Sequence, residues 1–357
     1  MTTDVSRDMR ANPRSTPISS AQATAFSTQL LDWFDQHGRH DLPWQVADDP
    51  YTVWVSEIML QQTQVKTVLQ YFARFMQRFP TVADLGRAHW DDVAPYWAGL
   101  GYYARARNLH KAAGIVAENG KFPVDLDGWM ALPGIGRSTA GALMSLGLRQ
   151  YGVIMDGNVK RVLARNFALD GDSMASSFLK HIWQIAEQLT PLDRTHDYNQ
   201  AIMDLGATLC TPKKPLCLYC PFNHSCLALA QNRVLELPQK PAKKAMPTRA
   251  AQVLLLEYDG QLLWQQRPAS GLWGGLWCLP LVEDDQALNA LNLPPARAGK
   301  AIKHTFTHFH WQLQAQHIQL DAQRAKQLAI ALAPARWMSR DVAFAAGVPE
   351  AMRKLLD

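Results

Sequence analysis

Four of the chain's five cysteines lie close together, and their spacing limits what the surrounding loop can fold around. Cys210, Cys217, Cys220 and Cys226 are separated by six, two and five residues. A structural zinc site usually pairs two close knuckles across a longer gap, and only Cys217 and Cys220 form such a pair. Four thiolates from one loop suit a cubane cluster, in which each iron takes one sulfur. The spacing therefore favours a 4Fe-4S cluster over zinc, in either a structural or a redox role.

The length and composition indicate a globular protein of two domains. A chain of 357 residues exceeds one ordinary core, and its 48% hydrophobic and 19% charged residues are typical of globular proteins. No apolar run approaches the ~18–20 residues that span a bilayer. Residues 1–20 are polar and lack a signal-peptide core, so we expect a disordered N-terminus, no membrane association and a cytoplasmic location. The net charge of +5 permits nucleic-acid binding without indicating it.

Helical periodicity runs through residues 21–231, and its breaks coincide with proline or glycine. One apolar stripe before the break at Pro80 recurs at three- and four-residue spacing and consists of Val65, Val68, Leu69, Phe72, Phe75 and Met76. This pattern predicts a mostly α-helical domain over 21–231 that includes the cysteine loop.

A change of composition at 232–250 predicts a linker. The segment has three prolines and five lysines or arginines against one glutamate. Beyond it, two apolar runs flank Asp259-Gly260, which is a strong hairpin signal. Strand-like runs near 304–314 and a closing helix near 349–356 complete an α+β domain at 251–357.

The segment Leu132–Ala140 places two glycines, Gly134 and Gly136, between two short helical stretches. Glycines at this spacing allow a tight turn, and the N–H groups at the start of the next helix form an anion site. Gly-x-Gly alone is weak evidence, but in this context it predicts a helix–hairpin–helix that grips a DNA phosphate without reading sequence.

Two carboxylates stand out as candidates for acid–base chemistry. Glu57 lies in an apolar run, where desolvation would raise its pKa and hold a proton ready near neutral pH. The alternative is a glutamate on the exposed edge of an amphipathic helix. Asp156 precedes a helical pattern and is equally well interpreted as its N-cap. A protonated acid beside an ionised one is a workable pair for breaking a glycosidic bond through an oxocarbenium-like state.

These motifs together resemble a known family. The segments SEIMLQQTQV, WAGLGYYARARNL, LPGIGRSTAGA and MDGNVKRVLAR and the four cysteines occur in this order, over roughly residues 25–350. They resemble the helix–hairpin–helix DNA glycosylases and, within them, the MutY family of adenine DNA glycosylases. The resemblance implies that Glu57 protonates the adenine and then helps water attack, while Asp156 stabilises the positive charge on the sugar.

The resemblance also implies contacts with double-stranded DNA. Gln62, Leu100 and Tyr102 match positions that wedge into the duplex when the adenine is flipped out; the alternative is a solvated glutamine and two core residues. Asp204 matches an acidic position near the base pocket in some relatives. The hairpin glycines, Ser138 and Lys160 would also lie at the DNA.

Ser138 bears on the mechanism. Relatives that also cut the strand carry a lysine nucleophile at this position, and serine cannot form a Schiff base. We therefore expect base removal without an efficient lyase step.

The second domain resembles the Nudix-like module at the C-terminus of the same family. Residues 267–277 resemble the approach to a Nudix box, but the metal-binding acidic helix is replaced by LVEDDQALNALNL, so we expect no pyrophosphatase activity. By resemblance Phe306, Thr307 and His308 would recognise 8-oxoguanine opposite the adenine. The three histidines of 304–310 would be an alternative metal site, although no carboxylate or cysteine lies near them in sequence.

The leading hypothesis is a monomeric enzyme that excises adenine from A:8-oxoguanine and A:G pairs. A pyrimidine-damage glycosylase/lyase of the same fold is the nearest rival, opposed by Ser138 and by the second domain. A non-catalytic iron–sulfur DNA-binding protein is a rival from another class, opposed by Glu57 in its apolar run. A Nudix hydrolase is disfavoured by the missing acids.

Overall fold

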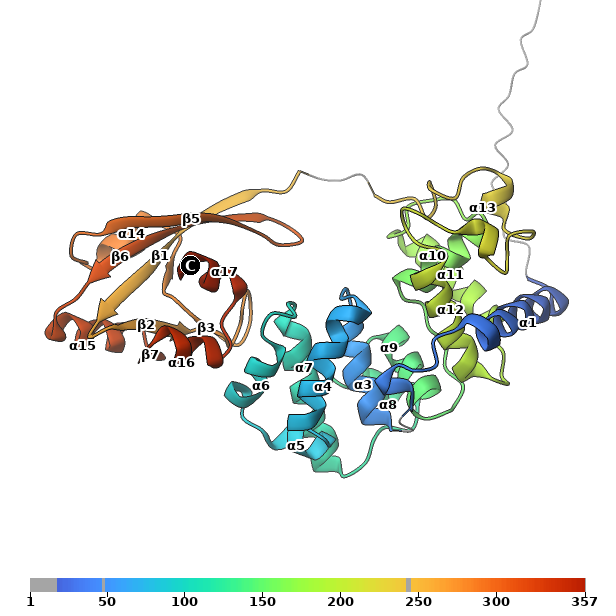
Figure 1. Cartoon of the computed structure of the whole chain (residues 1–357), viewed down its shortest axis with the longest axis horizontal. Helices are drawn as coiled ribbons and strands as arrows, with labels where there is room; N and C mark the ends of the chain where they lie inside the picture. The colour runs from blue at the N-terminus through green and yellow to red at the C-terminus, as the bar shows by residue number, and fades with distance from the viewer. Residues whose placement is uncertain (1–17, 47–48, 242–244, 357) are drawn as a thin grey trace, which may run out of the picture. The chain divides into compact units, whose positions relative to one another are not determined.

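Helices occupy the chain from Ser20 to Ala230, and strands dominate from Thr248 onward (Figure 1). The computed structural model describes residues 18–46, 49–241 and 245–356. Most of the N-terminal segment expected to be disordered lies outside these residues. The first helix nevertheless begins at Ser20, because the Ser19 hydroxyl accepts the Gln22 N–H and the Gln22 side chain accepts the Ser19 N–H.

The helical character predicted for residues 21–231 is confirmed where the structure describes them. The helices, with the π-helical turn η1 and the 3₁₀ turn η2, are α1 (Ser20–His37), α2 (Pro43–Val46), α3 (Pro50–Leu60), α4 (Val65–Arg78), α5 (Val82–Arg87), α6 (Trp90–Trp97), α7 (Tyr103–Asn119), α8 (Leu126–Met130), α9 (Arg137–Ala142), η1 (Leu143–Gly147), α10 (Gly157–Asn166), α11 (Ser176–Leu189), α12 (Thr195–Thr208), η2 (Cys217–Tyr219) and α13 (Leu227–Ala230). The predicted stripe lies on α4, where Val68, Phe72 and Phe75 are buried.

The C-terminal part is an α+β module, as predicted. Its elements are β1 (Thr248–Tyr258), β2 (Gln261–Gln266), β3 (Trp277–Cys278), β4 (Leu281–Val282), α14 (Asp285–Ala290), β5 (Arg297–Thr305), β6 (His310–Gln319), α15 (Ala322–Ala331), β7 (Ala335–Met338), α16 (Arg340–Ala345) and α17 (Glu350–Leu356). The sheet runs in the order β3-β2-β1-β6-β5, with β4 paired to β1 and β7 to β2.

The apolar run before Asp259 forms β1, the central strand of the sheet. It pairs with β6 in parallel and with β2 in an antiparallel hairpin, whose turn residues Asp259 and Gly260 both have positive φ, as the Asp-Gly signal predicted. One core cluster covers a face of this sheet and consists of Leu254, Leu256, Leu263, Val282, Ile318, Leu320, Ala325 and Leu328.

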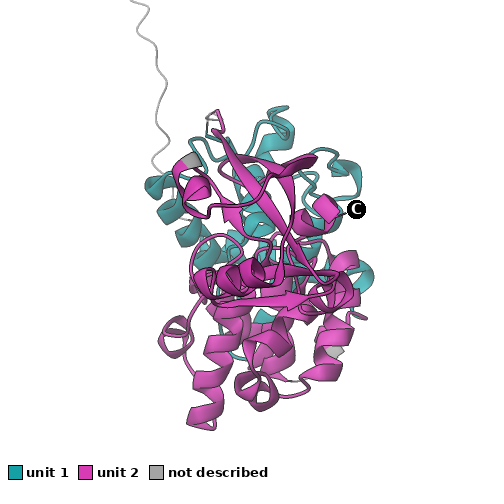
Figure 2. Cartoon of the chain, turned by 90° about the vertical axis from the view of Figure 1, so that its left-hand side faces the viewer, with its two compact units in different colours: residues 1–40, 149–241 teal, residues 41–148, 242–357 magenta. Residues whose placement is uncertain are grey.

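The chain divides into two compact units that do not follow its helical and sheet portions (Figure 2). The first unit comprises residues 1–40 and 149–241, and the second comprises 41–148 and 242–357. In the first unit α1 packs against α11 and α12, which brings the two ends of the helical segment together. In the second unit α3 packs against α4, α7 and η1, with Trp54 and Trp129 edge to face at 5.6 Å.

The segment predicted as a linker is structured at both ends. Leu237 is buried in the first unit, where its carbonyl accepts from Arg165 at 3.0 Å, and the carbonyl of Gln239 accepts the Ser173 N–H at 2.9 Å. At the other end, β1 already begins at Thr248. Charge and proline content predicted a solvated tether, but one buried leucine anchors its first part.

Candidate active site

Glu57 is a half-buried residue of a largely buried helix, α3. α3 begins at Pro50 because the Asp49 carboxylate accepts the N–H groups of Tyr51 and Thr52, at 3.2 and 3.0 Å. Its eight buried residues are Tyr51, Thr52, Val53, Trp54, Val55, Ser56, Ile58 and Met59. Glu57 thus lies on a largely buried helix and is itself half-buried, and an apolar environment of its carboxyl stays a prediction.

Three residues expected to enter the duplex lie at the ends of α3 and α7, and they differ in exposure. Gln62 is exposed and has a φ of 57°, just beyond α3. Tyr102 is 45% exposed and precedes α7 with a φ of 50°. Leu100 is 6% exposed, so it is a core leucine here. The positions of Gln62 and Tyr102 suit contact with a large ligand, whereas Leu100 would have to leave its packing to act as a wedge.

The predicted hairpin joins α8 to α9. Leu132 and Ile135 are buried and hold the loop on the core, while Gly134 turns the chain with a φ of 79°. A Cβ on Gly134 would lie 2.6 Å from the Cβ of Asn108, so a side chain is excluded there. Gly136 is exposed and is the N-cap of α9, which it caps without a side chain.

Asp156 is the N-cap of α10, as one interpretation of its position predicted. Its Oδ1 accepts the N–H groups of Asn158 and Val159 at 2.8 and 2.7 Å, and its Oδ2 accepts from the Asn158 side chain at 3.0 Å. Burial raises the pKa of Asp156, although these hydrogen bonds oppose the shift. The ionised carboxylate is therefore held against a desolvation cost. Lys160, one turn on, donates from Nζ to the Ser173 carbonyl at 3.1 Å.

A chain of hydrogen bonds connects Asp156 with the cysteine loop inside the first unit. Asn158 accepts from Arg161 Nη2 at 2.9 Å, and Arg161 Nε donates to the Cys210 carbonyl at 2.7 Å. α12 approaches closely at this point, since a Cβ on Gly206 would lie 2.6 Å from the Cβ of Asn158. Neither Asn158 nor Arg161 was predicted to have a role, although both lie in the segment that carried the family resemblance.

The four clustered cysteines line one apolar cavity of about 30 Å³ and form no disulfide with one another. Burial and the neighbouring sulfurs raise the pKa of the Cys220 thiol to about 12, and burial is also the main cause that raises the pKa of Cys217 and Cys226. Four thiolates would therefore need positive charge among them. Arg165 supplies some, since its Nη1 lies 3.3 Å from the Cys210 sulfur.

A site for a single metal ion needs several ligating side chains grouped around one point. Within the described ranges no three His, Cys, Asp or Glu side chains are grouped as ligands of one metal ion. A cubane cluster takes one sulfur at each of four iron corners, so the shared cavity and the thiol donor set are the features that fit it.

Asp204 lies in the interior of the first unit and is 1% exposed. Its carboxylate accepts from the backbone and guanidinium of Arg39, at 2.5–3.0 Å, and from Gln200 at 2.8 Å. This ion pair accounts for a buried acid in a helix. A role in the base pocket, suggested by the resemblance, stays a prediction.

The recognition segment expected at 306–308 forms the tip between β5 and β6. Phe306 is half-buried, and its N–H donates to the Phe309 carbonyl at 2.9 Å. Thr307 and His308 are exposed at the tip, within 3.3 Å of each other through Oγ1 and Nδ1. Trp273 packs its ring 5.6 Å from that of Phe306. The tip therefore presents two polar side chains above a small aromatic cluster.

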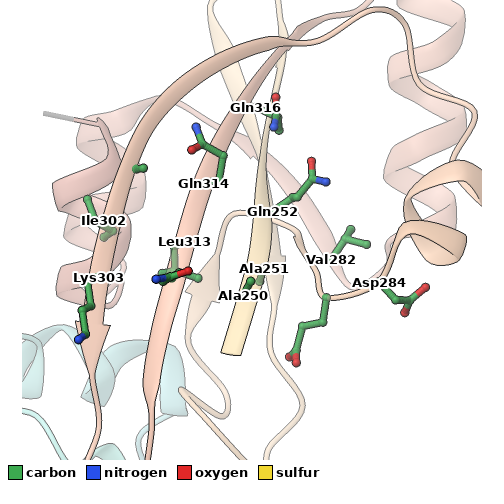
Figure 3. A pocket seen from close by; sticks show the side chains of 13 residues that line it. Ala250, Ala251, Gln252, Val282, Asp284, Ile302, Lys303, Leu313, Gln314 and Gln316 are labelled. Carbon is green, nitrogen blue, oxygen red and sulfur yellow. The ribbon is translucent and has the colours of Figure 1, made fainter. Parts of the chain in front are cut away.

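A separate cavity of about 550 Å³ lies on the sheet, lined by polar side chains from β1 and β6 such as Gln252, Gln314 and Gln316 (Figure 3). Glu283 and Asp284 are its acidic residues. Asp284 caps α14 by accepting the Ala287 N–H at 2.6 Å. The cavity thus lies on the sheet, and few of the groups that line it could bind Mg²⁺.

Comparisons with known proteins cover both parts of the chain. The model of the HhH-GPD superfamily base excision DNA repair proteins matches residues 55–188, and that of the NUDIX domain matches 251–357. An adenine DNA glycosylase of Buchnera aphidicola subsp. Acyrthosiphon pisum is 38% identical over 80% of this chain and 83% of its own. The adenine DNA glycosylase of Homo sapiens is 35% identical over 94% of this chain and 74% of its own. The chain belongs to the adenine DNA glycosylase family.

Two solved structures resemble more than half of the chain. A thermostable thymine-DNA glycosylase matches 58% of the chain and 97% of its own length, with a TM-score of 0.52 and 27% identity. An endonuclease III in a non-covalent DNA complex matches 60% of the chain and 98% of its own, with a TM-score of 0.51 and 21% identity. The latter likeness concerns the fold alone. Within the described residues no helix is long and apolar enough to cross a membrane.

Proposed function

We propose that this member of the adenine DNA glycosylase family acts as a monomer that hydrolyses the N-glycosidic bond of adenine paired with 8-oxoguanine or guanine in duplex DNA. The observation that carries the proposal is Glu57, a half-buried acid on a largely buried helix, in a chain with this family relationship. Because the bond to be broken lies inside the base stack, the adenine must first leave the duplex.

Glu57 is the proposed general acid. Adenine is a poor leaving group until a ring nitrogen is protonated, and a carboxylic acid in apolar surroundings supplies that proton. Once the base has left, the same carboxylate accepts a proton from the attacking water. One residue thus serves both steps without an external buffer.

Asp156 is the proposed stabiliser of the oxocarbenium-like sugar. Its two oxygens are fixed by the start of α10 and by Asn158, so the carboxylate needs no reorganisation when positive charge develops. The desolvation that raises its pKa also strengthens its attraction for a nearby cation.

Phosphate contacts would come from the hairpin, through N–H groups near Gly134, Gly136 and Ser138, and from Lys160. Gln62 and Tyr102 are exposed and would fill the space left by the flipped base, with Leu100 following by rearrangement. Because Ser138 replaces the lysine of the strand-cutting relatives, the product would be an intact abasic strand.

The C-terminal module would check the opposite base. Phe306 would stack on 8-oxoguanine, and the exposed Thr307 and His308 would provide hydrogen-bonding groups. This arrangement would restrict excision to adenines paired with the oxidised purine or with guanine.

A 4Fe-4S cluster would be held by Cys210, Cys217, Cys220 and Cys226 and would supply positive charge that balances the four thiolates. Arg165 would hydrogen-bond the sulfur of Cys210. The loop would then be fixed in shape, and Arg161 on α10 would connect it, through Asn158, to Asp156 at the start of the same helix.

The test is single-turnover excision from duplexes with one central A:8-oxoguanine, A:G, A:T or thymine-glycol:A pair. We expect selective release of adenine from the first two, leaving a strand that breaks only in alkali. Glu57→Gln should abolish release, whereas Glu118→Gln, which removes an exposed acid on α7, should not. Release from thymine glycol with spontaneous cutting would overturn the specificity. Full activity of Glu57→Gln would overturn the catalytic assignment.

A further inference from the structure

Two arginines on α7 hold two different loops of the second unit. Arg105 and Arg107 are two residues apart, so they leave the helix in nearly opposite directions. Arg105 donates to the carbonyls of Ile58 at 2.9 Å, Met59 at 3.3 Å and Gln61. These carbonyls end α3 and have no partner within that helix. Arg105 thereby fixes the end of the helix that carries Glu57.

Arg107 points to the C-terminal module. It donates to the Gly274 carbonyl, and Trp90 Nε1 donates to the neighbouring Gly275 carbonyl at 3.0 Å. The guanidinium lies 5.9 Å from the centre of the Trp90 ring. A Cβ on Gly275 would lie 2.9 Å from Trp90 Nε1, and its φ is 72°. Trp90 on α6 and Arg107 on α7 thus hold this turn through its backbone carbonyls. They approach the backbone so closely because the turn residues are glycines without a side chain.

The residue before these glycines supports the recognition tip. Trp273 is 8% exposed and has a φ of 53°, a conformation that a tryptophan adopts only when its surroundings impose it. Its ring centre lies 5.5 Å from that of His304, 5.6 Å from that of Phe306 and 5.3 Å from that of Trp311. A shift of the glycine turn would therefore move the floor under Phe306.

We propose that α7 couples the check of the opposite base to excision, with Arg107 and Trp90 as positioning residues for the recognition tip. The inference rests on the proposed function of Phe306 and Glu57. One helix of 17 residues links the two sites through contiguous contacts: Phe306 with Trp273, the glycine turn with Arg107, and Arg105 with the end of α3. Such contiguous packing has the physical form that carries coupling between sites.

The test compares excision from A:8-oxoguanine and A:G duplexes in single-turnover experiments. Arg107→Leu keeps the apolar stem and removes the donors. We expect it to slow excision opposite 8-oxoguanine about tenfold, within the usual range for coupled sites, and to change the A:G rate less than twofold. Arg107→Lys should recover part of the loss. Lys111→Leu removes an exposed charge one turn further along the same helix and should change neither rate.

Two further variants keep the test decisive. Trp90→Phe keeps the ring but not the N–H and should show a smaller loss with the same substrate dependence. In a double-mutant cycle, Arg107→Leu should cost nothing more once Phe306→Ala is present. Equal losses on both duplexes, or additive losses, would mean a merely structural role and would overturn the coupling.

The outcomes also separate this inference from the proposed function. If the unmodified protein excises equally from both duplexes, or if Phe306→Ala changes neither rate, the proposed recognition of 8-oxoguanine fails. If the protein discriminates, Phe306→Ala removes the discrimination and Arg107→Leu keeps it, only the coupling fails.

Discussion

Asp156 combines a structural and a proposed catalytic role, and substitution can separate them. Asparagine and aspartate are comparable N-caps, whereas alanine loses the cap at about 0.5–2 kcal/mol. Asp156→Asn would keep the acceptor for the two backbone N–H groups but place an amide NH₂ against the Asn158 side chain, which costs about one hydrogen bond, roughly 1 kcal/mol. The same change removes a desolvated carboxylate, so the two effects oppose each other.

The stability of these variants should depend on pH in a defined direction. Burial raises the pKa of Asp156 above 3.8, so the folded state favours the protonated carboxyl. The ionised form therefore costs stability above the folded pKa, and this cost disappears as the pH falls through that value. At pH 7 we expect the free energy of unfolding of Asp156→Asn to lie within about 1 kcal/mol of that of the unmodified protein. It should become relatively less stable as the pH is lowered.

Excision should respond far more strongly than stability. Removing one preorganised electrostatic group typically slows catalysis about 10²–10³-fold. We expect losses of this size in single-turnover excision from an A:8-oxoguanine duplex for both variants, with only Asp156→Ala lowering the melting temperature, by about 2–4 °C. Asp125→Asn is the matched control, because Asp125 caps α8 through the Gly128 N–H at 2.7 Å. If Asp156→Asn excised adenine within threefold of the unmodified rate, Asp156 would be only a cap.

Three shorter predictions follow from other contacts. Asp204→Ala should lower the free energy of unfolding by about 1–3 kcal/mol in urea titrations, because it removes the carboxylate acceptor of the half-buried Arg39 and the buried Gln200; an unchanged free energy of unfolding would contradict this. Cys220→Ser should lower the iron content of the purified protein, whereas Cys278→Ser, outside the cysteine loop, should retain it. Gly134→Ala should weaken binding to duplex DNA and destabilise the fold, because Gly134 has positive φ and no room for a Cβ. Gly136→Ala should leave the melting temperature unchanged, since no neighbouring protein atom lies within 4 Å of its Cβ position; equal losses of thermal stability in the two glycine variants would refute the argument.

Local patterns predicted the elements well because their causes are local. Proline and polar caps mark where helices begin, as at Pro50 with Asp49 before it. The period of the stripe around Phe72 identified the buried face of α4. The Asp-Gly pair at 259–260 predicted the hairpin because both residues tolerate positive φ.

Long-range partners could not be predicted, because nothing near them in sequence determines them. Asp204 accepts a hydrogen bond from Arg39, which is 165 residues away in the sequence. Arg107 donates to the carbonyl of Gly274, which is 167 residues away. The same holds for the division into two units, which depends on α1 packing against helices near residue 200. The family resemblance identified motifs that contain several of these residues but not the contacts they make.

Sequence patterns did not predict the backbone conformation at several residues with a proposed function. What these residues share is a positive φ without being glycine. Nine described non-glycine residues have positive φ, and most of them lie in turns or at helix ends. Three of them differ in that they lie at proposed DNA contacts. Gln62 and Tyr102 are themselves proposed to contact DNA, and Trp273 packs against Phe306 of the recognition tip. Arg105 donates to the Gln61 carbonyl and lies 4.9 Å from the Tyr102 ring, so one half-buried cation contacts the surroundings of two of these three residues. Such backbone strain persists only where tertiary contacts impose it. The arginines of α7 therefore explain both why these conformations exist and why sequence periodicity alone could not predict them.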